Sequence, residues 1–136
     1  MSIINWIKTI RETQGTNAKL DLLKVAMIDE TFQKVLFYTY NPFYNYYIRK
    51  LPKVVVGSLS VIGTFEAMFE LLDDLRERRF TGNLAIEKVT NLLQHSPAKV
   101  AEVFLLILGR DLKMGINTSS INKVYPGLIP TFDVML

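Results

Sequence analysis

The sequence predicts an all-α, compact single domain of about seven or eight short helices. Three observations support this prediction. Apolar residues recur at helical spacing along most of the chain, glycines and helix-capping residues separate these stretches, and only one short segment has extended character. At 136 residues the chain can bury a core without disulfides or a structural metal ion. Its composition, 49% hydrophobic and 21% charged residues, is typical of a folded globular protein.

Three helices are predicted before residue 41. Their apolar residues lie three or four positions apart, so each set lines one face of a helix. A break at Gly15-Thr16-Asn17 separates the first helix from the second. The apolar stripes are Ile3, Trp6, Ile7 and Ile10, then Leu20, Leu23 and Met27, then Phe32, Val35, Leu36 and Thr39.

Four more helices are predicted after residue 63. Thr64 is expected to cap the first, and Gly82 with Asn83 begins the second. Ser96 followed by Pro97 is a cap residue with proline in the first turn, and it begins the third. Thr118 or Ser119 caps a short last helix that ends near Val124. The inward residues are expected to be Phe65, Met68, Phe69, Leu72 and Leu75, then Ile86, Val89 and Leu93, then Val100, Val103, Phe104, Ile107 and Leu108.

One segment, from Lys53 to Val61, has extended character. A single such segment cannot form a sheet, so we expect a crossing loop or a short edge element. The apolar runs are too short to span a bilayer, and Met1 to Trp6 lacks the features of a signal peptide. Without cysteine and with one histidine, His95, no metal site is expected. We therefore expect a cytoplasmic protein, monomeric and without a membrane partner.

Charge is unevenly distributed along the chain. The net charge is +3, yet residues 31–65 contain no acidic residue and carry Lys34, Arg49, Lys50 and Lys53. Residues 66–80 instead mix acidic residues with arginines. On charge alone, solvated surface is the favoured interpretation over an anionic partner.

Groups suited to catalysis are scarce. Asp73 and Asp74 are adjacent, so on a helix they point about 100° apart and cannot share a substrate atom. Ion pairing with nearby arginines is the favoured interpretation. His95 follows a predicted helix, where it can donate to terminal carbonyls, and no serine or acid accompanies it in a catalytic pattern. These residues therefore give no support to an enzyme.

Aromatic residues gather between positions 37 and 47, ahead of Arg49 and Lys50. Aromatics interleaved with cations can stack and hold single-stranded nucleic acid. At helical spacing most of these rings should point inward, so core packing is favoured. The cluster consists of Phe37, Tyr38, Tyr40, Phe43, Tyr44, Tyr46 and Tyr47.

Two predicted helix starts fit phosphate binding. Thr81-Gly82-Asn83 places a glycine and two capping residues where free amides and the helix dipole attract anions. The segment from Gly115 to Ser119 repeats this arrangement, with Lys113 and Lys123 beside it and Arg110 earlier. The alternative is simple helix capping, which the residues alone favour.

Three blocks of sequence resemble one family in order and spacing. They are Tyr46 to Lys53, Phe80 to Glu87, and Arg110-Asp111-Leu112 with Gly115 followed by Asn122 to Pro130. Together they resemble the N-terminal DNA-binding domain of T-even-phage ATP-dependent DNA ligases. Residues 1–35 and Val54 to Gly63 do not carry the resemblance.

The resemblance implies an all-helical domain on the minor-groove side of nicked duplex DNA. It implies backbone-phosphate contacts without base specificity, while nucleotidyltransferase and OB-fold domains close around the nick. By position, the implied contact residues are Thr81, Gly82, Asn83, Arg110, Lys113, Gly115, Thr118, Ser119, Asn122 and Lys123, with Arg49, Lys50 and Lys53 as a second group.

The resemblance also implies a division of labour within a longer protein. Residues 1–130 would form the DNA-binding domain, and residues 131–136 would begin a linker to an absent catalytic domain. No Lys-x-Asp-Gly adenylation motif occurs in the sequence, so this chain is not expected to be an enzyme by itself. No cofactor is expected here, and ATP and magnesium are expected only for the full-length ligase of a phage, acting in the host cytoplasm.

A helical protein–protein interaction module is the alternative function. Its support is the high apolar content and a tail that looks exposed, made of Leu128, Ile129, Phe132, Val134, Met135 and Leu136.

Overall fold

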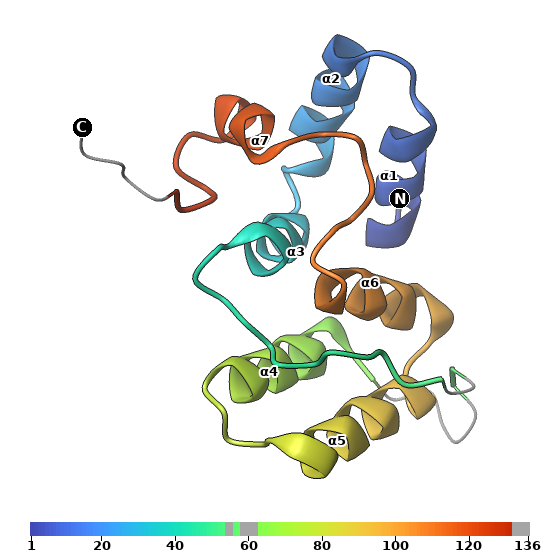
Figure 1. Cartoon of the computed structure of the whole chain (residues 1–136). Coiled ribbons are helices and arrows are strands. Elements are labelled where there is room, and N and C mark those ends of the chain that lie inside the picture. The colour runs from blue at the N-terminus through green and yellow to red at the C-terminus, as the bar shows by residue number, and fades with distance from the viewer. Residues whose placement is uncertain (54–55, 58–62, 132–136) are drawn as a thin grey trace, which may run out of the picture.

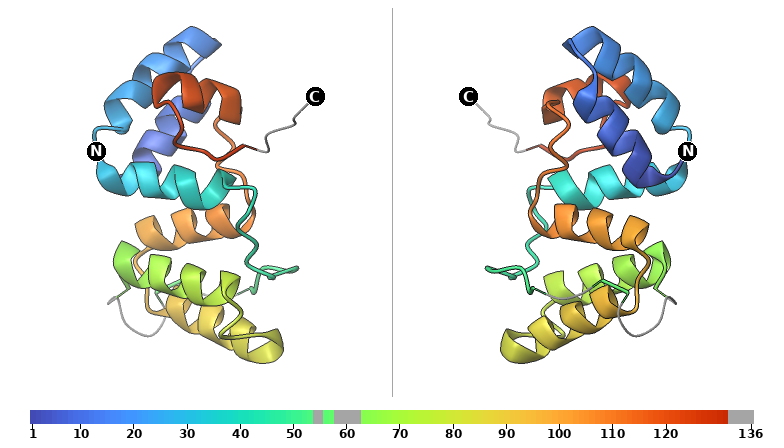
Figure 2. Two further views of the ribbon diagram at one scale, coloured as in Figure 1. Left: turned by 90° about the vertical axis from the view of Figure 1, so that its left-hand side faces the viewer. Right: turned by 90° about the vertical axis from the view of Figure 1, so that its right-hand side faces the viewer.

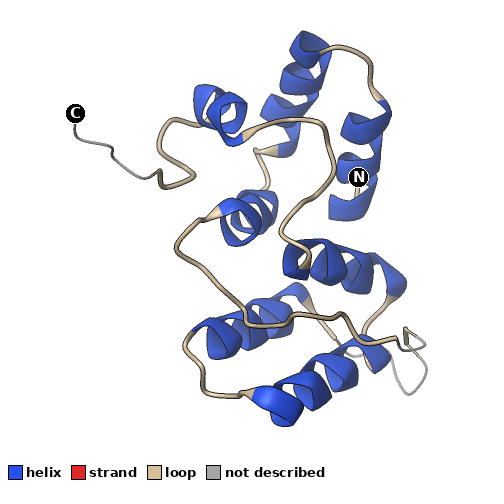
Figure 3. Ribbon diagram, in the orientation of Figure 1, coloured by secondary structure: helices blue, strands red, loops and turns tan. Residues whose placement is uncertain are grey.

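The computed structural model describes residues 1–53, 56–57 and 63–131, which contain seven helices and no strand (Figure 1, Figure 3). This confirms the all-α prediction. The expected extended segment lies mostly outside the described residues, although Lys53 is in a loop and residues 56–57 form a turn. The helices are α1 (Ile3–Glu12), α2 (Thr16–Ala26), α3 (Glu30–Tyr40), α4 (Phe65–Arg76), α5 (Gly82–Gln94), α6 (Ala98–Leu108) and α7 (Thr118–Val124).

The helices are stacked, with α6 in the middle. α6 packs against α1 and α3, α2 packs against α1 and α7, and α4 pairs with α5. Figure 2 shows α1, α2, α3 and α7 on one side of α6 and the α4–α5 pair on the other. The chain after α6 therefore starts near the centre of the molecule and runs back to the outer end of the stack at α7.

A single hydrophobic core connects all of these helices. Phe32 and Phe104 are among its largest fully buried side chains. Burying such side chains contributes about 1.5–3 kcal/mol each, so packing rather than helix propensity stabilises these short helices. None of the helices in the described residues is long and apolar enough to cross a membrane. The core includes Ile7, Leu23, Phe32, Leu72, Val89, Phe104 and Ile121, one from each helix.

Two of the predicted helix caps have different outcomes. Thr64 caps α4 as predicted, because its hydroxyl oxygen accepts from the Ala67 amide at 3.1 Å. The prediction for α7 was wrong. Asn117 is the cap, with Oδ1 accepting from the Ser120 amide at 2.8 Å, and Thr118 and Ser119 are the first helical residues. Asparagine caps as well as serine or threonine, so local sequence does not separate these candidates.

The cap predicted for α6 was also wrong. Pro97 occupies the capping position, and α6 begins at Ala98. The hydroxyl of buried Ser96 instead donates to the Leu92 carbonyl at 2.6 Å, closing the end of α5. The short connection between α5 and α6 leaves Ser96 within reach of the last turn of α5, where a free carbonyl needs a donor.

The buried face of α5 differs from the predicted one. Ala85, Val89 and Leu93 are buried, whereas Ile86 is 43% exposed. α5 lies at the outer edge of the stack beside α4 (Figure 1). An edge helix needs only a narrow stripe at every fourth position, so Ile86 and Leu84 remain outside it.

Candidate nucleic-acid interface

The two predicted phosphate sites lie at opposite ends of the helix stack. The start of α5 is at one end, and α7 is at the other (Figure 1, Figure 2). A single phosphate therefore cannot contact both. If both bind DNA, they contact it at separate points along the duplex.

The start of α5 has the backbone that the Thr81-Gly82-Asn83 motif predicts. Gly82 has φ +57°, a left-handed backbone conformation that residues other than glycine adopt only with strain. Thr81 occupies the capping position, but its side chain makes no capping hydrogen bond. Thr81, Gly82 and Asn83 are all exposed. The first turn of α5 thus presents amide donors without a side-chain cap, which suits an anion.

The loop after α6 contains several residues with left-handed backbone conformations. Arg110, Lys113 and Gly115 all have positive φ, at 63°, 59° and 74°. The Arg110 guanidinium donates to the Asn41 carbonyl at 2.7 Å and lies 5.9 Å from the centre of the Tyr46 ring. Arg110 therefore fastens the loop to the end of α3, while Lys113 is exposed.

Two cations that sequence analysis did not select hold the other side of this loop. The Arg11 guanidinium donates to the carbonyls of Leu112 at 3.0 Å and Lys113 at 3.3 Å. Lys19 Nζ donates to the Met114 carbonyl at 2.6 Å. A Cβ added at Gly115 would lie 2.8 Å from Lys19 Nζ, the mobile end of a long side chain, so it is the φ of +74° that favours glycine here. No local signal in the sequence links these residues to a loop about a hundred positions away.

Tyr40 supports the same loop from α3. Its hydroxyl oxygen accepts from the Leu112 amide at 3.1 Å, and its hydroxyl donates to Asp111 at 3.4 Å. Burial raises the pKa of Tyr40 to about 12; the Leu112 amide lowers it and the Asp111 carboxylate raises it. The hydroxyl stays protonated at neutral pH and can fill both roles.

Around α7 the predicted residues divide into exposed and engaged groups. The hydroxyls of Thr118 and Ser119 bond to no residue in the described parts of the chain, and Lys123 is exposed. Asn122 is engaged: its Nδ2 donates to the Ile129 carbonyl at 3.0 Å, and its Oδ1 accepts from the Ile129 amide at 2.9 Å. Asn122 thus holds the turn after α7, and Ile129, predicted to be exposed, is buried.

The structure brings Arg49, of the second predicted contact group, next to Arg78 in the turn between α4 and α5. Arg49 lines a hollow of about 520 Å³ with Asn45, Tyr47, Ile48 and Arg78. Lys50 and Lys53 are exposed. Leu51 lines a second hollow, of about 300 Å³, together with Arg11 and Lys113. Residues 47–51 therefore connect the α4–α5 turn with the loop after α6.

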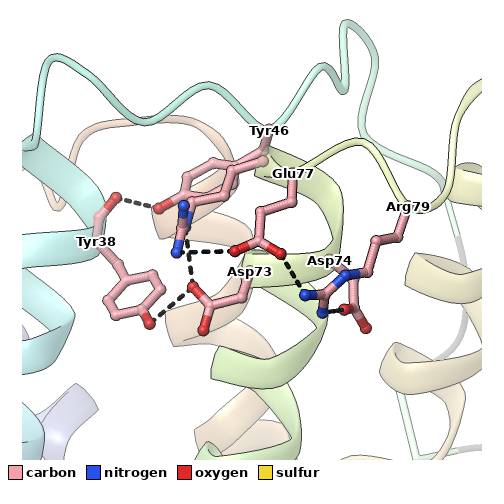
Figure 4. A network of polar contacts seen from close by, with 7 residues as sticks. Tyr38, Tyr46, Asp73, Asp74, Glu77 and Arg79 are labelled. Carbon is pink, nitrogen blue, oxygen red and sulfur yellow. Dashed lines mark hydrogen bonds and ion pairs between the residues drawn. The ribbon is translucent and has the colours of Figure 1, made fainter.

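The aromatic cluster is only partly in the core. Tyr46 is buried, but Tyr47 is 49% exposed and Phe43 is 61% exposed. Tyr46 and Tyr38 are fixed by hydrogen bonds, from the Tyr46 hydroxyl to the Tyr38 carbonyl and from the Tyr38 hydroxyl to Asp73 (Figure 4). Burial raises the pKa of both tyrosines. Core packing thus explains most of these rings and leaves Phe43 and Tyr47 at the surface.

Asp73 and Asp74 of α4 form ion pairs with nearby arginines, as predicted, although Arg78, one of the expected partners, is not among them. Asp73 pairs with Arg76 at 3.0 Å, and Asp74 pairs with Arg79 at 2.6 Å (Figure 4). His95 ends α5 with Nδ1 2.7 Å from the Asn91 carbonyl, which confirms its capping role. The described residues contain no group of three or more acidic or histidine side chains that could hold a metal ion.

Comparison with known proteins connects this architecture to DNA ligases. The chain is 34% identical over 138 aligned positions to the DNA ligase of Enterobacteria phage T4, and equally to that of phage T6. The match covers 100% of this chain and 28% of each ligase, at the N-terminal end. The chain thus spans little more than a quarter of these relatives. No protein-family model matches it.

Solved structures support the fold independently. A chain named Pmar-Lig_PreS3 matches with a TM-score of 0.86 at 19% identity, covering 96% of this chain and 32% of that one. Pmar-Lig_Pre. matches with a TM-score of 0.85 at 18% identity, covering 95% and 31%. The fold thus matches these structures, and the sequence match confirms the resemblance: the chain is similar over its whole length to the N-terminal part of phage DNA ligases.

Proposed function

We propose that this chain binds duplex DNA, nicked duplex in particular, through backbone phosphates and the minor groove and without sequence preference. In this proposal it is the DNA-holding part of an ATP-dependent ligase that acts in DNA replication, repair and recombination. The observation that carries the proposal is the whole-length similarity to the N-terminal part of phage DNA ligases. Such a part must hold any sequence, because nicks occur anywhere.

The surface chemistry agrees with phosphate contacts. Arg49, Lys113 and Lys123 are exposed on loops or a helix end, and the start of α5 presents amides without a side-chain cap. Cations and helix N-termini are the groups that usually contact DNA phosphates. Arg11 and Lys19 fix the backbone beneath Lys113, so little ordering of that loop is needed on binding.

The sealing reaction belongs to other parts of the proposed ligase. The sequence contains no Lys-x-Asp-Gly motif, so the lysine that would carry the adenylyl group is not in this chain. Nucleotidyltransferase and OB-fold domains, with ATP and magnesium, would supply that chemistry. This chain would contribute affinity and position.

Competition between DNA duplexes tests the absence of sequence preference. Unlabelled duplexes of the same length and unrelated sequence should displace a labelled duplex at equal concentrations, because phosphate contacts do not read bases. Displacement would be followed by fluorescence anisotropy. A mixed-sequence RNA duplex, whose grooves differ in shape from those of DNA, would serve as a comparison competitor. One DNA sequence that competes more than tenfold better would contradict the proposal.

A helical protein-interaction module remains the second candidate. The observation in its favour is the pair of exposed apolar side chains on α5, Leu84 at 47% and Ile86 at 43%. The C-terminal tail supports it less than the sequence suggested, because Ile129 is buried and residues 132–136 lie outside the described residues. If α5 serves a protein partner alone, Leu84→Glu should leave DNA binding unchanged and abolish binding of that partner.

A further inference from the structure

The three arginines at the end of α4 are in different electrostatic situations. Arg76 pairs with Asp73 and Glu77, and its guanidinium lies 4.4 Å from the centre of the Tyr44 ring. Arg79 pairs with Asp74 and Glu77 (Figure 4). The acidic residues of this turn therefore neutralise Arg76 and Arg79.

Arg78 has no ion-pair partner among the residues that the structure describes. It is exposed, and its guanidinium lies 4.3 Å from the centre of the Tyr47 ring. Its φ of 59° is fixed by two turn hydrogen bonds, from the Arg78 amide to Leu75 at 3.1 Å and from the Arg79 amide to Asp74 at 2.9 Å. The backbone thus directs this one arginine away from the acidic face of α4.

Tyr47, the partner of Arg78 in this contact, is held in a similar way. It also has φ 59°, and its amide donates to Asn45 Oδ1 at 2.8 Å. The non-glycine residues with positive φ in the described chain are Tyr47, Arg78, Arg110 and Lys113. Strained backbone of this kind gathers at functional sites. Here it gathers in the basic loops of the candidate interface.

We propose that Arg78 and Arg49 form a binding site for one phosphate of the DNA backbone, in the hollow of about 520 Å³ that they line with Asn45, Tyr47 and Ile48. This inference rests on the proposed function and adds to it a residue and a contact point. Guanidinium groups bind phosphate oxygens through two parallel hydrogen bonds, which suits a pair of arginines at one hollow. Tyr47 is a positioning residue, because its ring fixes the Arg78 guanidinium by a cation–π contact.

The proposed Arg78–Arg49 site lies close along the chain to a predicted phosphate site, the start of α5. The hollow lies at the turn that leads to Thr81, Gly82 and the first amides of α5. A phosphate held by Arg78 would therefore place the next part of the same strand near that helix start. Arg78 would join a contact that the sequence had assigned to Thr81, Gly82 and Asn83 alone.

Substitution of neighbouring arginines tests this inference. Arg78→Gln should weaken binding of the 136-residue chain to a labelled duplex by roughly tenfold at low salt. It should also reduce the slope of log K against log salt by about 0.9, as expected for one lost phosphate contact. Arg79→Gln removes the same charge one residue away, from an arginine already paired with Asp74 and Glu77. It should leave the slope unchanged, and equal effects of both variants would overturn the inference.

Two Tyr47 variants test the positioning role. Tyr47→Phe keeps the ring and should bind like the original chain, whereas Tyr47→Leu removes the cation–π contact and should weaken binding several-fold. Equal binding by Tyr47→Leu and Tyr47→Phe would overturn the positioning role. If the original chain shows salt-sensitive binding that Arg78→Gln leaves unchanged, this site alone is wrong. If the original chain does not bind duplex at low salt, the proposed function itself fails.

Discussion

Reversing the charge of two lysines, Lys113→Glu with Lys123→Glu, should abolish DNA binding while the fold remains intact. Both side chains are exposed, and neither forms an ion pair in the described parts of the chain. Each substitution removes a phosphate contact and adds a repelled carboxylate, so together we expect a loss of roughly a hundredfold or more at low salt. Fluorescence anisotropy with a labelled duplex measures the binding, and circular dichroism verifies the helices.

A matched control separates position from net charge. Lys24→Glu with Lys99→Glu makes the same change in total charge at two exposed lysines, one on α2 and one in the first turn of α6. This control should bind within about threefold of the original chain, since distant surface charges are largely screened at moderate salt. Unchanged binding by the Lys113–Lys123 variant would show that the contact assignment is wrong.

Phe104→Ala should lower the free energy of unfolding by about 3–5 kcal/mol. Phe104 is 1% exposed and lies on α6, the helix that packs against both α1 and α3. Its removal leaves a cavity at the centre of the stack, and the loss is large against a total stability of about 5–15 kcal/mol. Urea unfolding followed by circular dichroism measures the change.

The same experiment tests whether the helices share one core. Trp6, the single tryptophan, reports on α1, whereas circular dichroism reports on all helices. The two signals should give coincident transitions, because buried residues of every helix belong to one cluster. The half-buried neighbour Leu105 provides a control, and Leu105→Ala should cost clearly less. Separate transitions would contradict the single-core description.

Helical periodicity predicted the architecture because each helix buries a stripe against a shared core. It failed where a stripe borders an edge, as at Ile86 on α5, which is exposed although its spacing fits the inward face. Capping failed at Asn117, where three neighbouring residues are all good caps, and at Ser96, whose hydroxyl bonds backward to Leu92. These choices depend on neighbouring helices and turns that local sequence does not specify.

The candidate site was predicted less completely than the fold. Gly82 and Gly115 were selected as parts of helix-start motifs, and both have the positive φ that only glycine adopts easily. Arg78 was not selected, because its neighbours in sequence suggest an ion-paired surface and its contact with Tyr47 is visible only in three dimensions. The role of Arg11 was equally invisible, since its hydrogen bond to the Leu112 carbonyl joins residues 101 positions apart.

The measurement that tests the central claim most directly is a salt titration of DNA binding. Anisotropy of a labelled duplex, nicked and intact, would be recorded with this chain from low to moderate salt. If Arg49 and Arg78 together neutralise one phosphate, and Lys113 and Lys123 neutralise one each, log K should fall linearly with log salt with a slope of roughly −2.7. Absence of binding at low salt, or binding that does not change with salt, would contradict the proposal that this chain holds DNA by its phosphates.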